Sequence, residues 1–177
     1  MAKILALTIL QPWATLIAQG PKRVENRTWA PRGLKVGDYL ALHAGVFSPR
    51  LAEHWNGALE LAEHHRIVDD VPLLGQWSAV VDGERGRFYP ARCKRFLQGA
   101  VPHGAVIGVA RLAGVERETP ASDPWWCGPV GWRLGSVVAI EPVPCRGAQG
   151  LWELPPDVLA TVRERWAAAR IEGGDRG

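Results

Sequence analysis

The densest group of side chains able to do chemistry lies in residues 22–27, Lys-Arg-Val-Glu-Asn-Arg. Two cations, Lys22 and Arg27, stand on either side of one carboxylate, Glu25. Lysine and arginine neutralise phosphates, and a glutamate accepts a hydrogen bond from an exocyclic amine such as that of cytosine. Asn26 adds an amide that can pair with adenine through two hydrogen bonds. These residue types predict a site that binds a phosphate and recognises a base edge.

The spacing of these residues gives the segment two interpretations. In an extended segment alternate residues share a face, so Arg23, Glu25 and Arg27 would point the same way. A turn near Pro21 would bring Lys22 to that face. The same charges could instead form an internal ion-pair network that pins the end of a strand. Composition alone leaves both interpretations open.

A second basic cluster lies further along the chain, interrupted by Phe88 and Tyr89. Basic residues interleaved with aromatic residues are typical of surfaces that follow a nucleic-acid backbone. A solvated loop is the alternative. The predicted nucleic-acid-binding residues of this cluster are Arg85, Arg87, Arg92, Lys94 and Arg95.

Tryptophan is unusually common, with nine residues beside two tyrosines and three phenylalanines. A buried indole needs a partner for its N–H, and an exposed ring can stack on a base. We expect Trp29 or Trp132 to form a stacking wall beside the first basic cluster. The core is the expected place of Trp13, Trp152 and Trp166.

The histidines and cysteines predict no metal site. His54, His64 and His65 fall on one predicted helix but lack the H-E-x-x-H pattern, so we interpret them as a polar, exposed helix face. The three cysteines form no C-x-x-C pair, which argues against a disulfide framework or structural zinc. Cys127 lacks a histidine or aspartate pattern that would support a nucleophile. We therefore expect neither a metal nor a cofactor.

Apolar patterning predicts five or six short strands and few helices. A prediction of an α+β fold follows, in which a small, mixed, partly closed β-barrel carries flanking helices. We expect one domain over residues 1–177, with a terminal helix at about 156–171 and an irregular excursion at about 67–103 that has room for a short helix or hairpin. The predicted strands are 4–9, 22–29, 38–43, 105–115, 132–140 and 151–153, and the other predicted helices are 12–19 and 49–65.

Charge and hydropathy limit the kinds of partner that we expect for this protein. The net charge of +3 and the isoelectric point near 9.0 permit a polyanion partner without demanding one. No apolar run reaches the length that spans a bilayer, and the N-terminus lacks a full signal-peptide pattern. We expect a cytoplasmic protein with no membrane partner.

The order of several motifs carries a family resemblance. Gln11-Pro12-Trp13-Ala14 precedes Gly20-x-Lys22-x-x-Glu25-x-Arg27, within residues 7–29. Residues 39–44 and 106–112 follow, and then Gly131-Trp132 and Arg146-Gly147-x-x-Gly150-Leu151-Trp152. Taken together, these segments resemble the ASCH (activating-signal-cointegrator homology) family.

The resemblance implies a PUA-like β-barrel with a cleft that is associated with RNA or DNA. Lys22, Glu25 and Arg27 match the family motif and would lie in that cleft. Some members resemble hydrolases, including a ribonuclease and an amidohydrolase acting on 4-acetylcytidine. In the amidohydrolase a Lys-x-x-Thr pair supplies two catalytic groups. Lys22 matches the lysine, but Glu25 stands where the threonine would be, so the hydroxyl nucleophile is missing.

Three functions follow as hypotheses. The first is a module that binds RNA or single-stranded DNA, with a modified or extruded base in the cleft. The second is a hydrolase acting on a modified nucleoside or on RNA, with Lys22 and Glu25 as its catalytic groups. The third is a protein-interaction domain that uses exposed tryptophans and prolines.

Overall fold

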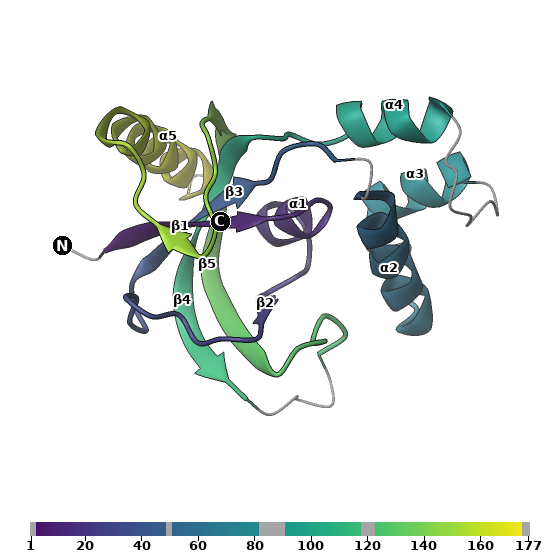
Figure 1. The fold of residues 1–177 in the computed structure, drawn as a ribbon, viewed down its shortest axis with the longest axis horizontal. Helices are drawn as coiled ribbons and strands as arrows, with labels where there is room; N and C mark the ends of the chain where they lie inside the picture. The colour runs from purple at the N-terminus through teal and green to yellow at the C-terminus, as the bar shows by residue number, and fades with distance from the viewer. Residues whose placement is uncertain (1–2, 49–50, 82–90, 118–122, 175–177) are drawn as a thin grey trace.

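The computed structural model describes residues 3–48, 51–81, 91–117 and 123–174. Its centre is a six-stranded mixed sheet in the order β2-β5-β4-β3-β1-β6 (Figure 1). Strands β1 and β3 pair in parallel, and the other neighbours in this sheet pair antiparallel. The strands are β1 Ile4–Ile9, β2 Val24–Arg27, β3 Tyr39–Ala44, β4 Ala105–Glu116, β5 Val130–Pro144 and β6 Leu151–Trp152.

The central strands bury both faces. In β1, Leu5 and Leu7 belong to the cluster inside the curled sheet, whereas Ala6 belongs to a cluster on the other face. This alternation follows from the two-residue period of a strand. The outer cluster lies under helix α5 (Pro156–Gly174), which therefore covers the convex side (Figure 1).

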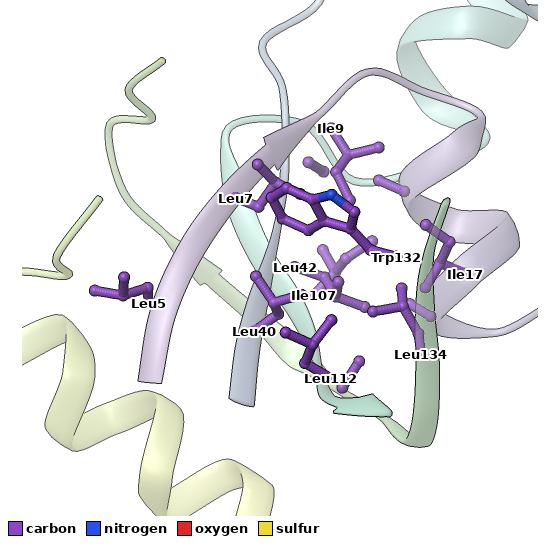
Figure 2. Packing of buried hydrophobic residues seen from close by; sticks show 14 of the residues in the cluster. Leu5, Leu7, Ile9, Ile17, Leu40, Leu42, Ile107, Leu112, Trp132 and Leu134 are labelled. Carbon is purple, nitrogen blue, oxygen red and sulfur yellow. The ribbon is translucent and has the colours of Figure 1, made fainter. Parts of the chain in front are cut away.

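The sheet curls into a partly closed barrel. The register of β4 against β5 shifts at three places, and the register of β3 against β4 shifts once. Such bulges bend strands and increase their twist. Figure 2 shows the inner face, where Trp132 packs among leucine and isoleucine side chains of several strands. The predicted α+β fold with a partly closed mixed barrel is confirmed.

The region from 67 to 103 is more regular than the sequence predicts. Where we expect an irregular excursion with a short helix or hairpin at most, the described residues contain two helices, α3 (Pro72–Val81) and α4 (Ala91–Gly99). Proline and glycine usually interrupt helices, but Pro72 stands at the first helical position, where its missing N–H costs nothing. Gly75 lies within α3 with no atom within 4 Å of where a Cβ would be.

These two helices pack on helix α2 (Leu51–His64) and form a second core beside the barrel (Figure 1). Trp55 and Trp77 are fully buried there, with ring centroids 5.6 Å apart, and Phe96 of α4 packs on both. The short helix α1 (Trp13–Ala18) lies between the sheet and this helical region. In the part of the chain that the structure describes, no helix is long and apolar enough to cross a membrane.

Candidate functional site

One pocket of about 400 Å³ lies where the barrel meets the helical region. The end of β1, the start of α1, strand β2, helix α2 and the segment around residue 127 each contribute to its wall. We call it the β2 pocket. Its lining residues are Thr8, Ile9, Leu10, Trp13, Lys22, Glu25, Asn26, Arg27, His54 and Cys127.

Lys22 lies deep in the β2 pocket, with 2% of its surface exposed. Its Nζ donates a hydrogen bond to the carbonyl oxygen of Val24. Burial lowers the pKa of Lys22 from its ordinary value, because a charged ammonium is poorly solvated there, and the nearby Glu25 carboxylate opposes this shift. A lysine ammonium has three N–H donors, and the bond to Val24 uses one of them.

Glu25 is 5% exposed and forms an ion pair with Arg27, whose Nε lies 2.9 Å from Oε1. Burial raises the pKa of Glu25, and the positive charges of Arg27 and Lys22 oppose that rise. Arg27 also donates from Nη2 to the carbonyl oxygen of Thr8, 3.1 Å away. The sequence predicts three charged groups, at 22, 25 and 27, in one site. The structure brings them together around one pocket, where Glu25 and Arg27 also contact one another.

Two polar residues of the segment have structural roles. Asn26 Nδ2 donates to the Trp125 carbonyl oxygen at 2.8 Å, and Asn26 Oδ1 accepts from the Cys127 N–H at 3.1 Å. Both ends of the amide therefore hold the loop around residues 125–127, whereas the sequence predicts that Asn26 pairs with a base. Arg23 donates from Nη1 to the carbonyl oxygens of Ile17, in the last turn of helix α1, and of Gly20 and Lys22, beyond its end.

The aromatic wall of the pocket comes from a different tryptophan than expected. Trp132 is fully buried in the barrel, and its Nε1 donates to the Trp29 carbonyl oxygen at 3.0 Å. Trp29 is half-buried and packs edge-to-face on Trp132 with ring centroids 4.8 Å apart. Neither ring lines the β2 pocket. Trp13, expected in the core, is half-buried and lines it, with Lys22 Nζ 5.7 Å from its ring centroid.

Only part of the second basic cluster lies within the described residues. Arg85 and Arg87 lie outside them, as does the side chain of Arg92. Lys94 and Arg95 are described on α4, where Lys94 is exposed, and neither residue lines the β2 pocket.

The pocket also has lining residues that the sequence does not predict for the site, among them His54 and Cys127. His54, expected on an exposed helix face, is half-buried and lines the pocket. Cys127 is exposed at the pocket, and Asn26 holds its backbone N–H. The periodicity of α2 could have indicated His54, because it lies one helical turn from Leu51 and Ala58, which are both buried. Among the described residues, no group of three His, Cys, Asp or Glu side chains could hold a metal ion.

Comparison with known proteins decides the family. The model of the ASCH domain matches residues 7–125, about two thirds of the chain. The chain belongs to the ASCH domain family. Comparison with curated proteins found no match. Among solved structures, the chain is similar to a serine-to-alanine mutant of ZmASCH from Zymomonas mobilis. That likeness covers 92% of this chain and 95% of the other, with 12% identity and a TM-score of 0.47.

The matched ASCH region contains every lining residue of the β2 pocket except Cys127. It begins within β1 and ends at Trp125, so it also includes α2, α3 and α4. Strands β5 and β6 and helix α5 follow the match. The pocket of this ASCH domain therefore lies almost wholly within the part of the chain that defines the family.

Proposed function

We propose that this ASCH domain binds a single-stranded nucleic acid, RNA or DNA, and holds one unpaired nucleotide in the β2 pocket. The observation that carries the proposal is the meeting of Lys22, Glu25 and Arg27 around one concave surface with a tryptophan beside them. Two cations with one carboxylate leave the pocket with excess positive charge, which favours an anionic ligand.

The size and lining of the pocket support one nucleotide rather than a duplex. Its volume of about 400 Å³ lies in the range of small-molecule sites. The half-buried ring of Trp13 offers a face for a base, and stacking on an aromatic side chain is worth roughly 1–3 kcal/mol. Removing a base from a duplex costs a few kcal/mol, whereas a single strand presents bases without that cost.

Fluorescence anisotropy with short labelled oligonucleotides tests the proposal. We expect single-stranded RNA or DNA to bind more tightly than the matching duplex, with an affinity that falls as salt rises. An excess of free mononucleotide should compete. Absence of binding to every oligonucleotide at low salt would refute the proposal.

A second candidate is hydrolysis of a modified nucleoside or of RNA, and the burial of Lys22 supports it. An amine whose pKa is lowered is more often neutral, and a neutral amine can act as a general base or nucleophile. Glu25 lines the same pocket as Lys22 and would supply the second catalytic group. Incubation with 4-acetylcytidine and with RNA tests this candidate. Substrate that remains intact at high protein concentration would exclude it and leave the binding role.

A further inference from the structure

Helix α2 contributes one side chain to the β2 pocket, although it lies outside the β-sheet. That side chain is His54, which is half-buried. Residues three and four apart lie on one face of a helix, so His54 shares its face with Leu51 and Ala58. Those two neighbours are 1% and 0% exposed, so this face of α2 packs inward and His54 extends it to the pocket wall.

The polar groups of the pocket lie at different depths. Lys22 is 2% exposed and hydrogen-bonds Val24, and Glu25 is nearly as buried. The side chain of Arg27 is 25% exposed and His54 is half-buried, so these two groups lie nearer solvent. A nucleotide that inserts its base first would leave its phosphate beside the more exposed groups. The deeper groups would then meet the base.

We propose that His54 is a phosphate-binding residue of the β2 pocket, which acts with Arg27 on the phosphate while Lys22 and Glu25 contact the base. The inference rests on the proposed nucleotide-binding function and states which residues contact the phosphate and which contact the base. An imidazole donates a hydrogen bond from a ring nitrogen, and in its protonated form it adds a positive charge and a second donor. Arginine supplies a planar donor set that matches phosphate oxygens.

Isothermal titration with two ligands tests the assignment. The ligands are cytidine and the methyl ester of cytidine 5′-phosphate, which differ by one negatively charged phosphate group. We expect the wild-type protein to bind the phosphate ester more tightly than cytidine. His54→Gln should weaken the ester about tenfold and leave cytidine unchanged. His54→Lys should restore tight ester binding.

The matched control is His65→Gln, because His65 is exposed just beyond the end of α2. It should bind both ligands as the wild type does, and thermal unfolding of each variant checks that the fold is kept. Equal loss of ester and cytidine in His54→Gln, or no loss of either, would overturn the assignment while leaving the pocket as a nucleotide site. Failure of the wild-type protein to bind the ester, cytidine and oligonucleotides alike would instead overturn the proposed function.

Discussion

Two pockets of almost equal volume lie near the segment 123–127, yet their chemistry differs. The β2 pocket measures about 400 Å³ and the second about 380 Å³. We call the second one the Arg133 pocket. Its lining residues are Pro21, Arg23, Ile67, Asp70, Asp123, Pro124, Trp125 and Arg133. Both pockets contain arginine, carboxylate and tryptophan, so residue type alone does not distinguish them.

The balance of charges separates the two pockets. The Arg133 pocket is lined by two arginines and two aspartates. Arg133 Nη1 contacts Asp123 Oδ2, and Arg133 Nε lies 2.9 Å from Oε2 of Glu116, which is not a lining residue. In the β2 pocket Lys22 and Arg27 meet the single carboxylate of Glu25. The first pocket therefore has as many carboxylates as cations, whereas the second has one cation more than carboxylates. An arginine beside a carboxylate is therefore evidence for a binding site only after the local charges have been counted.

Trp126 lies close to both pockets, and its displacement should disturb both. Its ring centroid lies 5.5 Å from the Arg133 guanidinium carbon, and the ring packs on Gly131. A Cβ at Gly131 would be 1.9 Å from Trp126 Cζ3, a distance that the packed ring cannot accept. We expect Gly131→Ala to lower the free energy of unfolding by about 1–3 kcal/mol or more, as overpacking does. Urea denaturation measures this.

Gly135→Ala on the same strand is the control for that prediction. Its nearest contact would be Ala113 Cβ at 3.5 Å, an ordinary van der Waals distance. It should change stability much less than Gly131→Ala. Equal losses for the two variants would mean that Trp126 does not limit the space at Gly131.

A paired replacement of the two arginines tests the charge comparison directly. Arg27→Met should weaken oligonucleotide binding by roughly 10- to 100-fold, since a charge-assisted hydrogen bond contributes about 1.5–3 kcal/mol. The slope of affinity against salt should fall by about one phosphate contact. Arg133→Met should leave affinity nearly unchanged and cost up to about 1 kcal/mol of stability, because its ion pairs are partly exposed. The opposite ranking of affinities would mean that the ligand occupies the Arg133 pocket.

Each pocket also has a tryptophan, and the two should respond differently. Trp13 is half-buried in the β2 pocket, whereas Trp125 is 3% exposed beside the Arg133 pocket. Trp13→Leu should weaken binding by roughly 1–3 kcal/mol through lost stacking. Trp125→Leu should lower the unfolding temperature more than the affinity, because it removes packing. Anisotropy and thermal unfolding on both variants make this comparison. Unchanged affinity in Trp13→Leu would remove the ring from the binding surface.

Much of the barrel could be predicted because its strands have the two-residue period and apolar runs that a half-buried sheet requires. Helices α3 and α4 could not be predicted, because the glycines and prolines of that region disfavour helix in a local pattern. The burial of Trp77 and Leu97 stabilises these helices, and a local pattern does not contain it. The segment 22–27 indicated the pocket by its charges. The places of Trp13 and Trp132 could not be predicted, because the burial of a ring depends on how distant elements pack, which local patterns do not contain.

The last contrast concerns Lys22, whose burial is unfavourable for stability. A group whose pKa is lowered on folding stabilises the fold only above its unfolded value, near 10.4 for lysine, and loses that contribution as the pH falls through its folded pKa. In the wild-type protein the free energy of unfolding should therefore gain an increment as the pH rises through the alkaline range toward that value. Glu25, whose pKa is raised, contributes the opposite trend in the acidic range.

Lys22→Met isolates this increment, because methionine keeps an unbranched side chain without the charge. We expect the variant to match or exceed the wild type in stability near neutral pH, to lack the alkaline increment, and to lose oligonucleotide affinity. Lys35→Met, at an exposed lysine that does not line the pocket, should keep all three wild-type properties. Denaturation curves over pH measure the difference. If the wild-type and Lys22→Met curves ran parallel through the alkaline range, the charge of Lys22 would carry no burial cost. The burial of Lys22 would then no longer be an argument that the pocket keeps this lysine for binding.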